Sequence, residues 1–156
     1  MRSDPPPPAP AGPAAARLRL ATAAVIDIAL HARPQPVNAR VLSARHGLPP
    51  RHLETVLQAL VRHGLLKGVR GPRGGYELAR ERRRISVGDI ARAAGSLEEE
   101  DGATSSPMGA IVEPTIRAAQ AAFLSALDAV TVEDLCRQAE ALDAVRPERQ
   151  EPHFDI

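Results

Sequence analysis

Residues 38–79 decide the fold, and they read NARVLSARHGLPPRHLETVLQALVRHGLLKGVRGPRGGYELA. Asn38 is a suitable N-cap for a short helix, and Gly47 is a suitable left-handed C-cap. A turn at residues 48–50 starts a second helix, which ends at Gly64. One stripe of this second helix is apolar at helical spacing, at Leu53, Val56, Leu57, Leu60 and Val61. The stretch therefore predicts two consecutive helices joined by a tight turn.

The second helix has a polar reverse face, and a hairpin follows it. At 100° per residue, this face carries Arg51, Thr55, Gln58 and Arg62. A basic, amide-rich face on the second of two short helices joined by a glycine turn is typical of a helix-turn-helix. Residues 65–70 and 76–79 then read as strands around a Gly- and Pro-containing loop. The sequence therefore predicts a winged helix-turn-helix domain, a mainly α fold with a small β-wing.

Further helices complete the predicted domain, which spans residues 17–96. Residues 17–33 are apolar on nearly every face, which indicates a helix that is buried on several sides and stops before Pro34. Ser86 and Asp89 have the spacing of a capping box, and they open a helix that closes near Gly95.

The remaining segments differ in composition from this domain. Residues 1–16 contain six prolines among Ala and Gly, and we expect them to be a disordered tail outside the fold. Residues 97–110 are acidic and then rich in Gly, Ser and Pro, which predicts a loop. Residues 111–145 are expected to form two helices, the second with Thr131 as its N-cap. Residues 146–156 are expected to be a disordered tail.

The first of these two helices has an apolar seam that fits a dimerisation helix. Its residues are spaced alternately by four and three over about three heptads, as in a coiled coil, at Val112, Ile116, Ala119, Phe123, Ala126 and Val130. The helix either packs on its own domain or pairs with a second subunit. We favour pairing, because a module of about 80 residues buries little surface by itself.

Charge is strongly segregated, although the chain has a net charge of only +1. Residues 17–96 hold 15 Lys and Arg against 5 Asp and Glu, a net charge of +10. Residues 97–156 hold 4 basic and 13 acidic residues, a net charge of −9. The basic block favours a polyanion such as nucleic acid, and the acidic block favours oligomerisation or regulation. Alternatively, the separation of charge has no binding partner and only keeps the protein soluble.

Composition argues against several other classes of protein. A single cysteine, Cys136, allows neither an intramolecular disulfide nor a Cys-rich zinc site. The longest apolar run, residues 21–32, is interrupted by Asp27 and His31 and is too short to span a bilayer. There is no basic segment leading into an apolar one at the N-terminus. We therefore expect a cytoplasmic protein.

No pattern of catalytic or metal-ligating residues stands out. We find no nucleophile with a base and no paired carboxylates, so we expect no enzyme activity. Asp27 is interpreted as a structural carboxylate. Four histidines lack ligand spacing and are interpreted as structural or phosphate-facing, namely His31, His46, His52 and His63.

The sequence resembles the Rrf-two-type winged-helix regulators, the bacterial group that includes IscR, NsrR and CymR. The resemblance runs from about residue 17 to residue 142. The segments that carry it are residues 26–31, 53–54, 63–65, 85–90 and 131–135 and, most specifically, the wing motif Val-Arg-Gly-Pro-Arg-Gly-Gly-Tyr at residues 69–76.

The resemblance implies a homodimer that binds palindromic operators in double-stranded DNA. We interpret the chain as a repressor, although the residues leave the sign of regulation open. Family base contacts carry over by position to Arg51, Glu54 and Thr55, and a minor-groove contact carries over to Arg70. Arg51 is alternatively a solvated surface charge. Glu54 alternatively offsets the charge of neighbouring arginines or lies on the flank of the core stripe. The full set expected to contact DNA is Asn38, Arg51, His52, Glu54, Thr55, Gln58, Arg70 and Arg73.

The chain departs from this family in its cysteines. Cluster-binding members carry three cysteines before the long helix, whereas residues 96–110 contain none here, so we expect no iron-sulfur cluster. The carboxylates at 98–101 are interpreted as an acidic loop rather than a cation site. Cys136 is either a small buried hydrophobe or, if it is exposed with a lowered pKa, a redox sensor.

These residues do not identify the signal that would change the activity of such a regulator. A small-molecule effector, a protein co-regulator or no input at all are the alternatives. A rival function is a winged-helix interaction module whose basic face docks an acidic protein partner, and it predicts no sequence preference on DNA.

Overall fold

The computed structural model describes residues 13–95 and 106–145. The chain is mainly helical with one two-stranded antiparallel sheet, as the sequence predicts. Its elements are α1 (Pro13–His31), α2 (Ala39–His46), α3 (Pro50–Arg62), β1 (Leu66–Val69), β2 (Gly75–Leu78), a 3-10 turn η1 (Arg82–Arg84), α4 (Val87–Ala93), α5 (Pro107–Asp128) and α6 (Val132–Val145).

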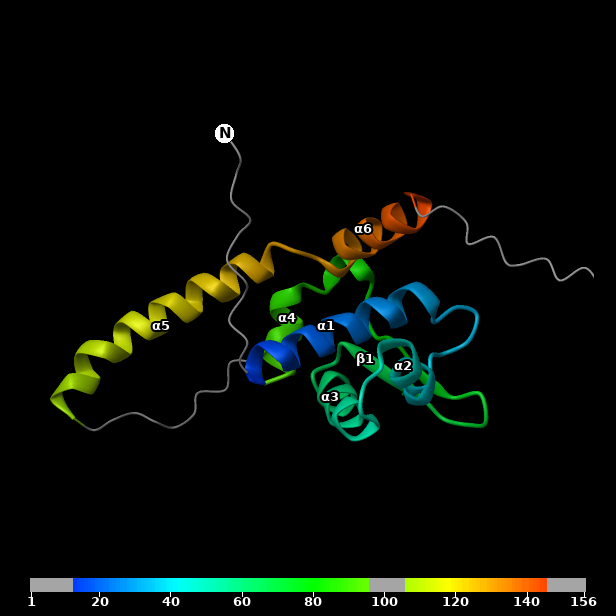
Figure 1. The fold of residues 1–156 in the computed structure, drawn as a ribbon, viewed down its shortest axis with the longest axis horizontal. Helices are drawn as coiled ribbons and strands as arrows, with labels where there is room; N and C mark the ends of the chain where they lie inside the picture. The colour runs from blue at the N-terminus through cyan, green and yellow to red at the C-terminus, as the bar shows by residue number, and fades with distance from the viewer. Residues whose placement is uncertain (1–12, 96–105, 146–156) are drawn as a thin grey trace, which may run out of the picture.

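Helix α1 forms the centre of the core. It packs against α3, α4, α6 and the wing strand β2 (Figure 1). Because other elements cover it on several sides, its sequence is apolar on nearly every face. Val25 and Ile28 are fully buried in the same cluster as the α3 stripe, and each such side chain contributes roughly 1.5–3 kcal/mol. Within that stripe Leu53, Val56, Leu57 and Leu60 are buried and Val61 is half-buried, which confirms the predicted helix phase.

Two helices begin earlier than their sequences predict. Helix α1 starts at Pro13, so residues 13–16 are helical and the predicted tail over 1–16 ends too late. Helix α5 starts at Pro107, so residues 107–110 do not belong to the predicted loop. In both cases proline occupies the first turn, where its missing N–H costs nothing. The predictions for residues 1–12, 96–105 and 146–156 lie outside the described residues.

Helices α4 and α6 begin side by side with reciprocal caps. Ser86 and Asp89 form the predicted capping box, with hydrogen bonds of 2.9 and 3.0 Å. Thr131 and Asp134 do the same at 3.1 and 3.0 Å, and these bonds lower the pKa of the Asp134 carboxyl. The two N-caps pair with each other in an antiparallel bridge, Ser86 with Thr131. The start of α6 is thereby fixed to the start of α4.

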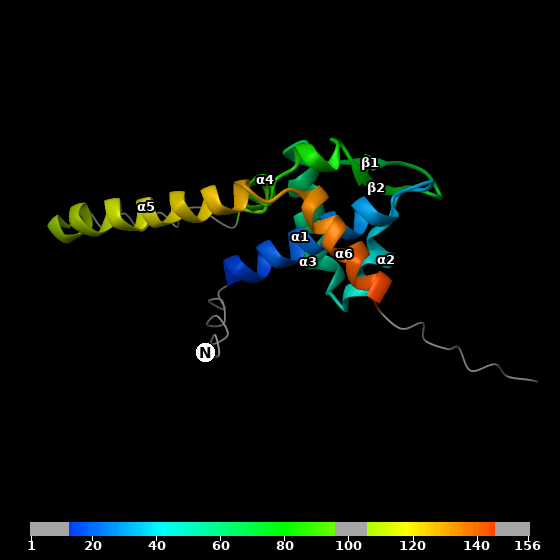
Figure 2. The ribbon, with the colours of Figure 1, turned by 90° about the horizontal axis from the view of Figure 1, so that it is seen from above.

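Helix α5 projects away from the rest of the chain (Figures 1 and 2). None of its 22 residues is buried. Its C-terminal end is anchored on α4, because Asp128 accepts hydrogen bonds from Arg92 Nη1 at 2.8 Å and Nη2 at 2.6 Å. Gly88 lies so close to Asp128 that a Cβ atom at residue 88 would collide with its carboxylate.

The predicted seam includes one residue, Val130, that lies beyond the C-terminal end of α5. Val130 lies two residues beyond α5, is half-buried, and accepts a 2.8 Å hydrogen bond from the Val87 amide through its carbonyl. The chain turns here because that carbonyl pairs with α4 instead of continuing the helix. The other five seam residues lie on α5 and are exposed.

Among the residues described, no helix is both long and apolar enough to cross a membrane.

Candidate nucleic-acid interface

Helices α2 and α3 form the predicted helix-turn-helix. Asn38 caps α2, since its Oδ1 accepts a 2.8 Å hydrogen bond from the Val41 amide. Gly47 ends α2 with φ of 60°, a conformation in which glycine is unstrained. Ser43 Oγ donates to the Leu48 carbonyl at 2.6 Å across the turn. The sequence signals for both caps are confirmed.

The outer face of α3 is free of contacts with the core. All five predicted contact residues on it are exposed, namely Arg51, His52, Glu54, Thr55 and Gln58. Thr55 Oγ1 donates to the Arg51 carbonyl at 3.1 Å, so the hydroxyl also has a partner within the helix. Among the residues described, no cation lies within 4.0 Å of the Glu54 carboxylate. Within that part of the chain Glu54 thus forms no ion pair, and its roles as a base contact or as a counter-charge stay predictions.

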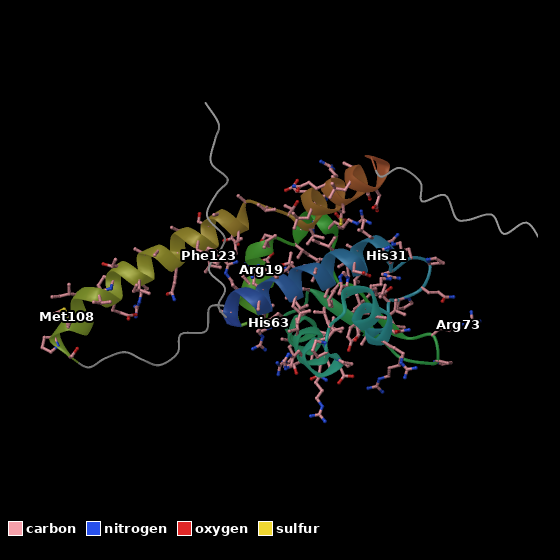
Figure 3. All side chains as sticks on the ribbon, viewed as in Figure 1. Arg19, His31, His63, Arg73, Met108 and Phe123 are labelled. Carbon is pink, nitrogen blue, oxygen red and sulfur yellow. The ribbon has the colours of Figure 1, made fainter. Side chains whose placement is uncertain are left out.

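The wing carries two exposed arginines on a loop that glycine makes possible. Strands β1 and β2 pair in antiparallel register from Leu66 with Leu78 to Val69 with Gly75. Gly71 has φ of 116°, and a Cβ at Gly74 would collide with the Val69 carbonyl. Arg70 and Arg73 are exposed on this loop, and Figure 3 shows Arg73 at the far end of the wing.

A bridge that the sequence analysis missed joins the wing to the helix-turn-helix. The Val37 amide donates to the Tyr76 carbonyl at 3.0 Å, and the Tyr76 amide donates back at 2.8 Å. Val37 immediately precedes the α2 N-cap Asn38 and is buried. Gly75 belongs to the same contact, because a Cβ there would lie 2.5 Å from the Val37 carbonyl. The arginine loop and the two helices are thus held as one unit.

A buried carboxylate holds the end of α2 on α1. Asp27 is 5% exposed and accepts hydrogen bonds from Arg45 Nη1 at 2.5 Å and His46 Nε2 at 2.8 Å. His31 Nδ1 lies 3.3 Å from the same carboxylate. This confirms Asp27 as a structural carboxylate and gives His31 and His46 structural partners.

The donor set does not fit a cysteine-ligated iron centre. Iron-sulfur clusters are held mainly by several cysteine thiolates, and this chain has one cysteine. Cys136 is fully buried in α6, and burial raises the pKa of its thiol. Within the described ranges, no three His, Cys, Asp or Glu residues are grouped to hold a metal ion. The interpretation of Cys136 as a redox sensor is wrong, because a sensor cysteine needs exposure and a lowered pKa, and Cys136 has neither.

Comparison with known proteins gives consistent matches. A family model called Rrf2, described as an iron-dependent transcriptional regulator, matches residues 14–138. The protein rrf2 of Nitratidesulfovibrio vulgaris is 32% identical over 130 residues, which cover 79% of this chain and 86% of the relative. The regulator IscR of Xenorhabdus nematophila is 40% identical over 75 residues, which cover 48% of this chain and less than half, 46%, of the relative.

The fold matches solved structures as well. The structure of T. potens IscR superimposes with a TM-score of 0.66 and 31% identity, covering 84% of this chain and 90% of that one. The winged helix, the Rrf2 match over residues 14–138 and the relative matched over 86% of its length agree with one another. The chain therefore belongs to the Rrf2 family of transcriptional regulators.

Proposed function

We propose that this chain is a homodimeric repressor that binds palindromic operators in double-stranded DNA, without an iron-sulfur cluster. The observation that carries the proposal is the main-chain connection between two exposed basic elements. The outer face of α3 and the loop with Arg70 and Arg73 are joined through the Val37–Tyr76 bridge. A helix and a hairpin held in this way can enter a major groove and the adjacent minor groove together.

In this arrangement each residue type has a matching chemical partner. Arg51 suits guanine O6 and N7, Glu54 suits the cytosine amino group, and Gln58 suits adenine. Asn38 uses its Oδ1 for the α2 cap, which leaves its side-chain NH2 to donate to a phosphate. Arg70 suits a narrow minor groove, where the negative potential is strongest.

Dimerisation is supported by the exposure of the α5 seam. Val112, Ile116 and Phe123 are 49%, 50% and 47% exposed, although such residues are usually buried. Figure 3 shows Phe123 on the projecting helix. Pro114 removes one hydrogen bond inside α5, and few isolated helices are stable in water. A second copy packed on this seam would supply the missing burial.

A dimer also explains how a small domain reads a long site. Two α3 helices related by a two-fold axis would contact half-sites about 34 Å apart, one turn of DNA. Occupation of such an operator excludes other proteins from the same DNA, which is the simplest form of repression. An input, if the regulator has one, would come from an effector or a protein co-regulator rather than from a cluster ligated by cysteine.

The test is selection of bound duplexes from a random pool, combined with the mass of the protein in solution. We expect a palindromic consensus, a mass of two chains, and affinity that falls with salt by a slope of about −0.9 for each phosphate contacted. A monomer that ignores every duplex at low salt would refute the proposal. Binding to all duplexes alike would favour the rival function, docking of an acidic protein.

A further inference from the structure

A hollow with basic walls lies between the end of α1, the base of the wing, η1 and α6. Its volume is about 740 Å³, within the range of about 300–1,000 Å³ that is typical of small-molecule sites. Its apolar part is formed by the half-buried Ala29, Leu30 and Leu78 and by the exposed Ala79. Helix α6 lies on the opposite side of α1 from α3 (Figure 1), and no α3 residue is among those that line the hollow, so the hollow is separate from the outer face of α3.

The charges on its walls are unbalanced. Six cations line the hollow against three carboxylates, and the cations are Arg33, Lys67, Arg80, Arg82, Arg83 and Arg137. Each wall carboxylate already has a wall cation, in the pairs Glu77–Lys67 at 3.0 Å, Glu81–Arg83 at 2.7 Å and Glu133–Arg137 at 3.3 Å. The excess positive charge is therefore carried by the three remaining arginines.

Two of these three arginines remain available for a ligand. Arg82 Nη2 donates to the Ala29 carbonyl at 2.6 Å, and its Nη1 lies 3.6 Å from Glu140, so its position is structural. Within the described ranges, Arg33 and Arg80 have no carboxylate within 4.0 Å. They come from the segment after α1 and the segment after β2, and both line the hollow. Guanidinium groups bind carboxylates and phosphates through paired hydrogen bonds.

We propose that this hollow binds a small amphiphilic anion, whose carboxylate or phosphate contacts Arg33 and Arg80 while its hydrocarbon or aromatic part covers the apolar wall. Neither charge nor apolar area alone would select such a ligand. A purely ionic ligand would leave the apolar wall exposed, and a neutral one would leave the two arginines without a counter-charge.

The location of the hollow links this ligand to DNA binding, and this link rests on the proposed function. Lys67 and Glu77 are cross-strand partners at the base of the wing that carries Arg70. On the other side the hollow is lined by α6, whose N-cap Thr131 is bridged to the start of α4 beside the anchor of α5. A bound ligand would thus contact the elements that orient the wing and the dimerisation helix.

The experiment measures binding by calorimetry on the full chain without DNA. The probes are octanoate and phenyl phosphate, with octanol as the neutral analogue and acetate and inorganic phosphate as anions without an apolar part. We expect saturable binding in the millimolar range or tighter for at least one amphiphilic anion, and at least about tenfold weaker binding of the three simpler probes.

Variants locate the site. Arg33→Gln combined with Arg80→Gln should weaken binding of the amphiphilic probe by at least about tenfold. Arg19→Gln combined with Arg117→Gln changes the net charge equally on α1 and α5, outside the hollow, and should bind as the wild type does. Ala79→Phe fills the hollow from an exposed position without changing charge, and it should also prevent binding.

Several outcomes would overturn the proposal. They are absence of saturable binding by both amphiphilic probes, equal binding of acetate or phosphate, equal binding of octanol, and retained binding in the Arg33 and Arg80 variant. The link to DNA is tested separately, by the affinity for the selected duplex with and without the bound probe, and an unchanged affinity would refute that link. Failure to bind any DNA would refute the proposed function but leave the calorimetric result standing.

Discussion

Helices α3 and α5 are both amphipathic, but only α3 has its apolar side covered. In α3 the stripe that includes Leu53 and Leu57 is buried in the core, and the polar side faces outward. In α5 the apolar seam is itself exposed, and none of the 22 residues of the helix is buried. The difference shows that the apolar face of α3 is packed within one chain, whereas the seam of α5 is left exposed in it, and in our proposal a second copy covers that seam.

The strongest test of this difference removes apolar side chains from each helix in turn. Leu57→Ala should lower the free energy of unfolding by roughly 2–5 kcal/mol, because Leu57 is fully buried and its truncation leaves a cavity. Phe123→Ala should leave the unfolding of the winged domain nearly unchanged under conditions where the protein is monomeric. Urea denaturation of both variants makes the measurement. Similar losses in the two would mean that α5 belongs to the same core.

A second test uses two alanines that lie on opposite sides of α5. Ala119 is on the seam and Ala121 faces away from it, and both are exposed in one chain. Ala119→Asp should raise the dimer dissociation constant roughly 100-fold, about 2.7 kcal/mol, because a carboxylate would be buried between the helices. Ala121→Asp should leave it nearly unchanged. Sedimentation equilibrium gives both constants, and equal effects would show that the seam is not the interface.

A third test compares arginines of the wing and of α5. Arg70→Ala should weaken binding of the selected operator by roughly 1–3 kcal/mol. Arg117→Ala removes the same charge from α5, where Arg117 pairs with Glu113, and should leave operator affinity almost unchanged. Titration of a labelled duplex at fixed salt measures both. A loss shared by the two variants would assign the effect to net charge instead of to the wing.

The smallest expected effect concerns pH and the anchor between α4 and α5. Hydrogen bonds from the Arg92 guanidinium hold the pKa of Asp128 below its ordinary value. A carboxyl with a depressed folded-state pKa adds stability above the unfolded value of about 3.9 and loses it as the pH falls toward the folded value. Asp128→Asn should therefore be slightly less stable than the wild type at pH 7, and the difference should shrink below about pH 4. A difference that stays constant in urea unfolding down to acid pH would contradict this.

Local signals in the sequence predicted most of the winged domain. Caps such as Asn38, Gly47 and the Ser86–Asp89 box depend on neighbouring residues, so their types alone indicate where helices begin and end. The phase of α3 followed from its apolar spacing. The starts of α1 and α5 were missed because proline near a helix start resembles proline in a loop.

The unpredicted features depend on residues far apart in the chain. Val37 pairs with Tyr76 through main-chain atoms, and such pairing does not require particular side chains, so the sequence does not indicate it. Asp27 could be identified as structural, but its partners Arg45 and His46 lie in another helix. The sequence also suggested two roles for Cys136, and only its burial in the folded chain decided between them. The DNA contacts on α3 and the wing stay predictions.

In the proposed dimer, the residue at position 88 would influence the distance between the two DNA half-sites that the dimer contacts. Gly88 lets the end of α5 approach α4 as closely as it does. From there α5 extends 22 residues, or about 33 Å. A tilt of about 10° at this end would move the far end by about 6 Å, nearly two base-pair steps of DNA. A larger side chain at this one residue could therefore alter half-site spacing during evolution while every base-reading side chain stays the same.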